Sequence, residues 1–181
     1  YDFIIQALSG IMDLTGEPDG EPQKMGVAFA DIFTGLYGVI AIQSALRVRE
    51  QSQKGQHIDL SLMDSMIAVL ANQASNYFVS GKSPKRMGNK HPNIVPYQVF
   101  KVKDGHLIIA VGNNEQFERF CKVIGLDYLC SSEEYNNNQK RVQNREKLVE
   151  IITSKTMEYN KNDLKSLLEE NNVPVGSVND I

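Results

Sequence analysis

A stretch that interrupts regular structure divides this chain and limits what it can fold into. Residues 81–92 read Gly-Lys-Ser-Pro-Lys-Arg-Met-Gly-Asn-Lys-His-Pro, a basic segment without a hydrophobic period. Glycine and proline end helices and strands. The sequence therefore predicts a linker over 81–96, with one folded segment before it (1–80) and another after it (97–181).

Composition excludes several classes of protein. The chain has 181 residues, of which 41% are hydrophobic and 23% charged, as in an ordinary globular protein. Its formal net charge of −3 gives no basic surface for a nucleic-acid backbone, so we expect no nucleic-acid partner. Apolar stretches end well before the roughly 20 residues of a membrane span, so we expect a soluble protein without a membrane partner.

The remaining composition bears on compartment and on metals. Cys121 and Cys130 are the only cysteines, and they lack the spacing of a disulfide framework or a zinc site. The three histidines also lack metal-ligand spacing, so we expect no metal and a reducing, intracellular compartment. Residue 1 is Tyr and reads as the start of a helix already under way, from which we expect a piece of a longer chain.

Hydrophobic spacing predicts mainly helices in the first segment. Apolar residues recur at helical intervals over 2–14, and further helices are expected over 32–49 and about 61–78. A short strand is expected at 57–60 because apolar and polar residues alternate there.

The second segment has the pattern of a small α+β module. Alternating residues over 97–102 and 106–111 flank Asp104-Gly105, which predicts a β-hairpin. Amphipathic spacing predicts helices over 114–124, about 141–157 and 162–170, and residues 173–175 should be extended. The polar run at 136–139 is expected to be a loop.

Asp31 is the first candidate for chemistry. It stands between a short apolar segment and the predicted helix that begins at Ile32, the usual place of an N-cap. The positive end of the helix dipole and free backbone N–H groups keep such a carboxylate ionised. An anion held in place in this way also suits a nucleophilic carboxylate, so both interpretations remain open.

The arrangement of these residues resembles CoA-transferase family III, the CaiB/BaiF family, over the whole chain. The resemblance rests on Tyr1-Asp2, Gln6-Ala7, Ser9-Gly10, Thr15-Gly16, Gly26-Val27, Asp31 and Gly35, on Gly55-Gln56 and Ile58-Asp59, and on the runs 86–98 and 112–117. The second-half runs are similar to the branch of that family that acts on dicarboxylic acids.

The resemblance implies a fold. Residues 1–80 would be the end of a large, Rossmann-like α/β domain that carries the catalytic aspartate, and 97–181 would be a small α+β domain. The complete protein would be an interlocked homodimer, and most of its CoA-binding surface would lie in a part that precedes this chain.

The resemblance also implies a reaction. Asp31 would attack a succinyl-CoA-like thioester to form a mixed anhydride, and the released thiolate would convert the anhydride to an aspartyl-CoA thioester. An acceptor carboxylic acid, expected to be a dicarboxylate, would then receive CoA. A CoA thioester would be the substrate, no cofactor would be permanently bound, and the expected location is the bacterial cytoplasm or an organelle matrix.

Six further residues, and Lys90 beside two of them, are expected to contact substrate. Tyr1 and Asp2 would be neighbours of Asp31, although an aromatic residue and an N-cap at a helix start explain them equally well. Arg86 and His91, with Lys90, would bind the distal carboxylate of a dicarboxylic acyl group. The alternative for these three is a solvated basic linker. Tyr97 and Gln98 would line the same pocket or serve only the strand.

Two features of this chain differ from other members of the family and bear on its function. Well-known members of the family have a run of glycines near residues 87–93 that closes over the aspartate, whereas this chain has one glycine there. CoA-ester racemases of the family have a histidine where this chain has Tyr1. A phenol, with a pKa of about 10, is a poor base at neutral pH, which favours transfer over racemisation. A catalytically silent member of the family is the third hypothesis.

Overall fold

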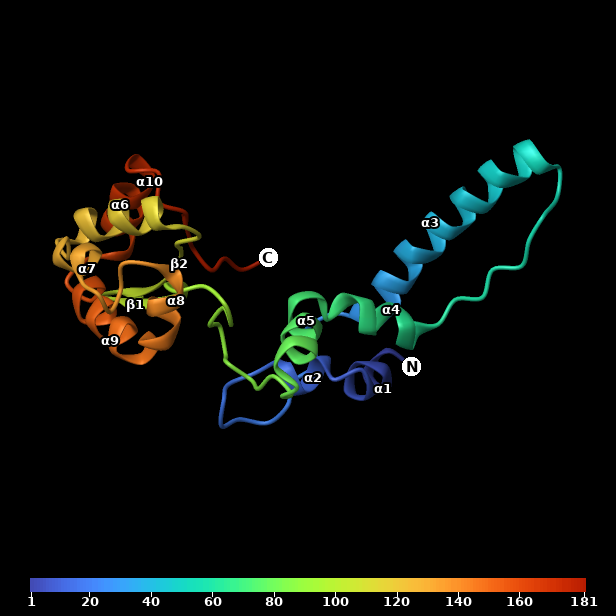
Figure 1. The fold of residues 1–181 in the computed structure, drawn as a ribbon, viewed down its shortest axis with the longest axis horizontal. Helices are drawn as coiled ribbons and strands as arrows, with labels where there is room; N and C mark the ends of the chain where they lie inside the picture. The colour runs from blue at the N-terminus through green and yellow to red at the C-terminus, as the bar shows by residue number, and fades with distance from the viewer. The chain divides into compact units, whose positions relative to one another are not determined.

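The structure, a computed structural model, describes residues 1–181. The chain forms two compact units, Tyr1–Gly88 and Asn89–Ile181 (Figure 1). Their boundary falls within residues 81–96, where there is no helix or strand. The mixture of helices and one small sheet agrees with the expected α/β class.

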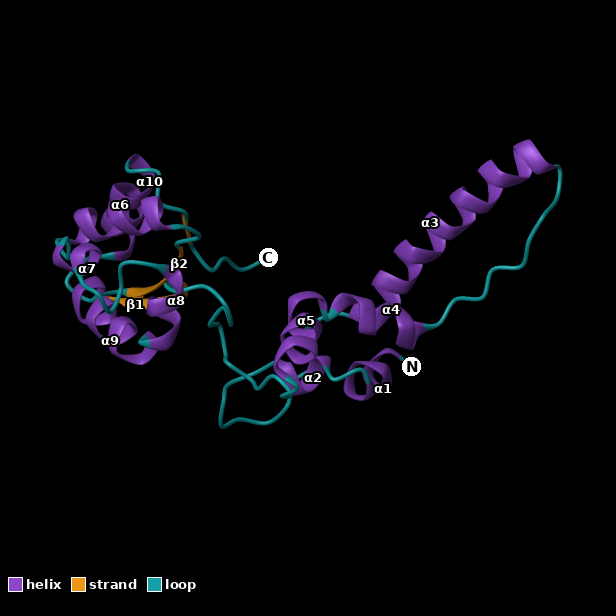
Figure 2. Ribbon diagram, viewed as in Figure 1, coloured by secondary structure: helices purple, strands orange, loops and turns teal.

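The first unit contains helices only (Figure 2). Its elements are α1 (Asp2–Leu8), α2 (Ile11–Leu14), α3 (Phe29–Ser52), α4 (Leu62–Val69) and α5 (Ala71–Ser80).

Two helices predicted as continuous are each broken in the structure. The helix expected over 2–14 ends at Leu8 and resumes at Ile11, because Gly10 has φ +89°, which a helix does not allow. The helix expected over 61–78 is interrupted in the same way, with φ +48° at Ala71, the first residue of α5. The side chain of Ser61 caps α4 by accepting from the backbone N–H groups of Met63 and Asp64.

The strand predicted at 57–60 is absent. These residues belong to no helix or sheet, and they are exposed. A strand needs a neighbour for its backbone donors and acceptors, and the first unit contains no strand that could supply them. The alternation of apolar and polar residues at 57–60 was therefore not enough to predict a strand.

Helix α3 is longer than the helix expected over 32–49, and it contains a longer apolar stretch than the sequence analysis recognised. It has 24 residues, and of these only Ala30 is buried in the structure. Its length and composition are sufficient to cross a membrane, so the expectation that no apolar stretch is long enough was wrong. Core helices of soluble proteins can have the same length and composition, so these two properties of α3 are weak evidence for a membrane span. Large apolar side chains are exposed along it, at Ile32, Leu36, Tyr37, Val39, Ile40, Ile42 and Val48.

The predicted hairpin is confirmed in the second unit. Strands β1 (Tyr97–Val102) and β2 (Gly105–Ala110) are antiparallel, and Val102 pairs with Gly105. The turn is therefore formed by Lys103 and Asp104, one residue earlier than expected. Strand β3 (Val175–Gly176) pairs antiparallel with the other edge of β2.

Five helices surround this sheet: α6 (Asn114–Ile124), α7 (Tyr128–Ser131), α8 (Asn138–Gln143), α9 (Arg145–Thr156) and α10 (Lys161–Glu170). The predicted bounds of α6 are confirmed. The predicted loop at 136–139 was wrong in part, because Asn137 is the N-cap of α8 and accepts from the N–H of Lys140 at 3.0 Å.

The second unit has its own hydrophobic core. Helix α9 packs on β1, and α10 packs on β2, β3 and α6. The core side chains that these contacts bury completely include Leu107, Ile109, Phe120, Ile152 and Leu164. All residues of this core lie between Val95 and Val175, so it is built without the first unit.

Candidate active site

Asp31 lies in the first turn of α3 and is exposed. It is the third residue of the helix, which begins at Phe29 with Ala28 as N-cap, so the interpretation of Asp31 as the N-cap was wrong. Its carboxylate forms no hydrogen bond or ion pair within the chain. A carboxylate in the first turn is stabilised by the positive end of the helix dipole. Asp31 thus stands on an ordered backbone with its carboxylate oxygens open.

The start of α3 is capped by a side chain from another helix. The Oδ1 atom of Asp2, in α1, accepts a hydrogen bond from the backbone N–H of Ala30 at 2.7 Å. Its Oδ2 atom accepts from Nε2 of Gln6 at 2.7 Å. A residue 28 positions earlier therefore fixes the turn that carries Asp31.

Gln6 completes this network and was not predicted. Its side chain is fully buried, and its Oε1 accepts from the backbone N–H of Met25 at 2.9 Å. Its Nε2 also donates to the carbonyl oxygen of Val27 at 3.4 Å. Gln6 thus holds the segment that leads into α3. The signal in the sequence was the i, i+4 spacing of Asp2 and Gln6 on a helix.

Tyr1 stands next to the same network. It is the N-cap of α1, and its carbonyl oxygen accepts from the N–H of Ile5 at 3.1 Å. Its side chain is 95% exposed and forms no hydrogen bond within the chain. Tyr1 precedes Asp2 and Asp31 follows Ala30, and a hydrogen bond joins Asp2 to Ala30. The structure therefore brings the two candidates Tyr1 and Asp31 to the same end of α3.

Arg86 has other partners in the first unit. Its Nη1 atom forms an ion pair with Asp13 at 2.9 Å and donates to the carbonyl oxygen of Asp13 at 3.1 Å, while its Nε donates to the carbonyl oxygen of Glu17 at 3.3 Å. The guanidinium therefore ties the end of the first unit to the loop after α2. Its contact with substrate stays a prediction.

His91 and Tyr97 meet in the second unit. The backbone N–H of His91 donates to the carbonyl oxygen of Tyr97 at 2.9 Å, and their ring centroids are 5.1 Å apart. Nδ1 of His91 accepts from the backbone N–H of Asn93 at 3.1 Å, so the proton of the neutral ring is on Nε2. Burial, followed by the nearby charge of Arg145, lowers the pKa of His91 below its usual value. The ring is therefore neutral at pH 7.

Gln98 and Lys90 have contacts other than those of the His91 and Tyr97 rings. Gln98 in β1 is buried on the same face of the strand as the core residue Phe100, and its Oε1 has no hydrogen-bond partner. Lys90 forms an ion pair with Glu146 at 3.4 Å. The six expected substrate residues thus fall into three places: Tyr1 and Asp2 with Asp31, Arg86 elsewhere in the first unit, and His91, Tyr97 and Gln98 in the second.

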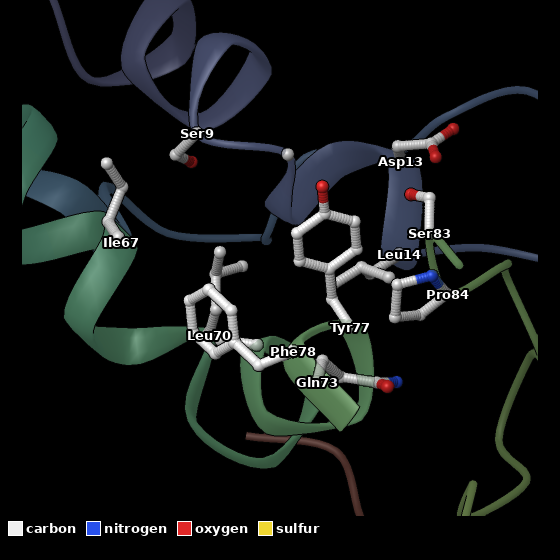
Figure 3. Close-up of a pocket in the computed structure, with 12 residues that line it drawn as sticks. Ser9, Asp13, Leu14, Ile67, Leu70, Gln73, Tyr77, Phe78, Ser83 and Pro84 are labelled. Carbon is white, nitrogen blue, oxygen red and sulfur yellow. The ribbon is translucent and has the colours of Figure 1, made fainter. Parts of the chain in front are cut away.

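The first unit also has an apolar pocket that contains none of these residues (Figure 3). It has a volume of about 330 Å³ and lies between α1, α2, α4 and α5. The ring of Tyr77 stands in it near Leu14 and Pro84 (Figure 3). A pocket is a common place for a ligand, but the one carboxylate in the lining of this pocket, Asp13, is paired with Arg86.

Neither metals nor thiols provide an alternative centre in the structure. No group of three or more His, Cys, Asp or Glu side chains is placed to hold a metal ion. Burial is the main cause that raises the pKa of Cys121 and of Cys130. A nucleophilic cysteine needs a lowered pKa, so Asp31 remains the candidate nucleophile.

Comparison with known proteins identifies the family. The chain belongs to CoA-transferase family III, whose model matches residues 1–181. It is 51% identical over 181 residues to the succinate–glutarate CoA-transferase of Agrobacterium fabrum, covering all of this chain and 45% of that protein. It is 42% identical over 181 residues to the succinyl-CoA:glutarate CoA-transferase of Mus musculus, covering all of this chain and 42% of that protein.

A solved structure agrees with this assignment. The crystal structure of a CaiB/BaiF family protein from Brucella suis is 56% identical, with a TM-score of 0.78, over 99% of this chain and 48% of that one. The resemblance to the family and the expected fold class are thereby confirmed. The chain spans less than half the length of each of these relatives.

Proposed function

We propose that this chain belongs to an enzyme that moves CoA from succinyl-CoA to a dicarboxylic acid, glutarate being the best candidate, with Asp31 as nucleophile. Membership of the family supports CoA transfer. The names of the two relatives described above support succinyl-CoA and glutarate as the substrates.

The state of Asp31 is the observation that carries the mechanism. Its carboxylate is exposed and unpaired, while Asp2 and Gln6 hold the backbone on which it stands. A nucleophile whose backbone is already ordered loses little further freedom when substrate arrives.

Four substitutions at carbonyl carbon complete the proposed reaction. A carboxylate oxygen of Asp31 attacks the thioester carbon of succinyl-CoA, and the C–S bond breaks to give an anhydride and CoA thiolate. The thiolate attacks the aspartyl carbon, releasing succinate and leaving an aspartyl-CoA thioester. The acceptor carboxylate attacks this thioester to form a second anhydride, and the thiolate then attacks the acceptor carbon and restores Asp31.

This sequence of steps matches the chemical groups at the site. Each step exchanges an anionic oxygen or sulfur for another, so no proton has to be transferred and no general base is required. In this proposal the hydroxyl of Tyr1 donates a hydrogen bond to a carbonyl oxygen of the acyl group or anhydride; its support is that Tyr1 precedes Asp2, which caps the turn of Asp31. Racemisation, by contrast, needs a base at the α-carbon, and the position at which the family's racemases have a histidine holds Tyr1.

The remaining expectations extend this proposal to the complete protein. CoA esters act as substrates and no cofactor is permanently bound. A second copy of the chain completes a homodimer, and α3 is covered by protein rather than lipid, because a helix that is apolar on all sides suits the core of a larger protein. Nucleic acid and membrane are not partners. The location is the bacterial cytoplasm or an organelle matrix.

Trapping the intermediate tests the proposal. The product of the complete reading frame is incubated with succinyl-CoA and then with hydroxylamine, and peptide mass spectrometry locates the resulting hydroxamate. We expect the modification at Asp31 and only in the presence of the CoA ester. In Asp31→Asn, turnover should fall by at least about a thousandfold while the thermal unfolding temperature is retained.

A matched control separates the nucleophile from an acidic surface residue. Asp19 lies exposed in the loop before α3, and Asp19→Asn should leave turnover and labelling unchanged. Labelling at a carboxylate other than Asp31 would disprove the assignment. Full activity of Asp31→Asn would have the same meaning.

A further inference from the structure

The side chain of Gln6 is a buried polar group whose hydrogen bonds all lead toward the start of α3. Its exposed fraction is 0%, and its partners are Asp2, Met25 and Val27. Removing an amide from water costs free energy unless new hydrogen bonds replace those to water. An apolar side chain would fill the same space without this cost. The presence of an amide here is therefore explained by its hydrogen bonds rather than by packing.

The partners of the Gln6 amide determine which way it points. Its Oε1 accepts from the backbone N–H of Met25 at 2.9 Å, which only the oxygen of an amide can do. Its Nε2 donates to the carboxylate of Asp2 at 2.7 Å and to the carbonyl oxygen of Val27 at 3.4 Å. The position thus requires an acceptor on one side and a donor on the other. An ionised carboxylate, which can only accept, would not fit.

The hydrogen bond to Asp2 connects Gln6 to the turn of Asp31. Oδ2 of Asp2 accepts from Gln6, and Oδ1 accepts from the backbone N–H of Ala30, both at 2.7 Å. Gln6 therefore fixes the carboxylate by one oxygen while the other oxygen holds the residue before Asp31. Together with the bonds to the segment that leads into α3, the main chain is held on both sides of the N-cap, Ala28.

The two carboxylates at this end of α3 differ in the use of their oxygens. Both oxygens of Asp2 accept hydrogen bonds, whereas the oxygens of Asp31 have no partner within the chain. Loss of the donor at Gln6 would release one oxygen of Asp2 and let its carboxylate turn away from Ala30. The amide of Gln6 thus acts on the turn of Asp31 through Asp2.

We propose that Gln6 is a positioning residue for the nucleophile: through Asp2 it fixes the turn that carries Asp31. Because Gln6 is fully buried, it acts without touching the substrate. A nucleophile that is displaced from its near-attack position reacts more slowly even when substrate is bound. This inference rests on the proposed function and adds to it a residue on which the reactivity of Asp31 depends.

The buried amide has a single charged neighbour. The helices packed on α1 are α2, α3 and α4. The charged residues of these helices and of the loop before α3 are Asp13, those at 17–24, Asp31, those at 47–50, and Asp64. All of them are exposed, and none forms a hydrogen bond with the amide. Asp2 is thus the one charged group that a new charge at position 6 would meet.

An apolar side chain of similar length tests the role of the amide. In Gln6→Met, kcat for transfer of CoA from succinyl-CoA to glutarate should fall about 10- to 100-fold, the effect of a displaced reacting group. KM for succinyl-CoA should not change. The product of the complete reading frame is used, at a temperature at which circular dichroism shows the variant to be folded. Unchanged kcat in folded Gln6→Met would overturn the proposal. A higher KM with unchanged kcat would also overturn it, because Gln6 would then act in substrate binding.

A carboxyl group at position 6 separates positioning from a general loss of stability. In Gln6→Glu, the neutral acid can donate to Asp2 and accept from Met25, as the amide does, whereas the ionised form opposes the charge of Asp2. Burial and a like charge raise the pKa of such a carboxyl group. The ratio of kcat to that of the wild type should therefore rise about tenfold from about pH 8 to about pH 6. A ratio independent of pH would contradict the proposal, and this comparison decides if Gln6→Met does not fold.

Gln23→Glu is the matched control. Gln23 lies exposed in the loop before α3, and its substitution adds the same charge to the same unit. Its kcat should equal that of the wild type at each pH. A loss in Gln23→Glu as large as that in Gln6→Glu would attribute the effect to charge near the loop rather than to the buried amide, and the proposal would fail.

Hydrogen exchange distinguishes this inference from the proposed function. If the wild type transfers no CoA and hydroxylamine does not label Asp31, the proposed function fails. Exchange of the backbone N–H groups of Met25 and Ala30, followed by mass spectrometry, still tests whether Gln6 fixes the turn. Faster exchange in Gln6→Glu than in Gln23→Glu at about pH 8 would support the inference. Equal exchange in the two variants would exclude it.

Discussion

At the scale of single residues, His91 shows how the main chain sets the protonation of a side chain. The N–H of Asn93 donates to Nδ1, which a protonated ring could not accept. Burial and the charge of Arg145 act in the same direction and lower the pKa of His91. The folded chain therefore binds fewer protons at this position than the unfolded chain when the pH falls below about 6.5.

This difference predicts an acid-dependent loss of stability. The contribution of His91 is fully present above the unfolded pKa of about 6.5 and is lost as the pH falls through that value toward the lower folded pKa. We expect His91→Gln to flatten the dependence of the unfolding free energy on pH between 7 and 5, measured by urea denaturation. His106→Gln, an exposed site on β2, is the control. Parallel curves for wild type and His91→Gln would contradict the prediction.

The sequence predicted the residues of the site unevenly. Asp31 was recognisable because it stands at a helix start, whereas Asp2 was named only through the resemblance to the family. Gln6 was missed because its role depends on bonds to main-chain atoms of residues distant in the sequence, Met25 and Val27. No periodicity or motif in the sequence reveals such bonds, because every residue type has the same backbone carbonyl oxygen.

At the scale of elements, the cap of α3 couples two helices. The Asp2 carboxylate satisfies the N–H of Ala30 and also accepts from Gln6, so its removal affects both the helix start and a buried amide. We expect Asp2→Ala to lower the free energy of unfolding by about 1–2 kcal/mol, the usual range for loss of an N-cap.

The same variant should impair turnover by disordering the turn of Asp31. Urea denaturation and the rate of CoA transfer are measured on the same preparation, with Asp19→Ala in the exposed loop as the control. Asp2→Ala with unchanged stability would show that the cap is not formed in solution. Lower stability with unchanged turnover would show that the cap does not position Asp31.

The elements that the sequence predicted well are those stabilised by neighbouring residues. Helix α6 has its N-cap in Asn113 and ends at Gly125, which has φ +69°, and both signals are visible in the sequence. The hairpin likewise needs only its own two strands. The breaks at Gly10 and Ala71 were missed, because an amphipathic pattern continues across a kink that tertiary packing imposes.

At the scale of the whole molecule, the two units differ in what they bury. The core of the second unit is complete within Asn89–Ile181, whereas α3 in the first unit leaves most of its apolar side chains exposed. We expect residues 89–181 expressed alone to unfold cooperatively in urea and to give a dispersed NMR spectrum. Residues 1–88 alone should aggregate, because such a surface seeks a partner.

Gel filtration and urea unfolding of the two pieces check this expectation. A non-cooperative transition for residues 89–181 would show that its core depends on the rest of the protein. A monomeric, cooperatively unfolding piece 1–88 would show that α3 folds back on its own unit in solution.

The hydrogen bonds of Gln6 and Asp2 also determine where the polypeptide tolerates added length. The loop before α3 is closed at its base, because the N–H of Gln23 donates to the carbonyl oxygen of Thr15 at 3.0 Å and Met25 is held by Gln6. Extra residues inside such a closed loop add only a small, logarithmic entropy term. A peptide tag placed between Gly20 and Glu21 should therefore leave the turn of Asp31 undisturbed, which makes this position suitable for immobilisation or labelling.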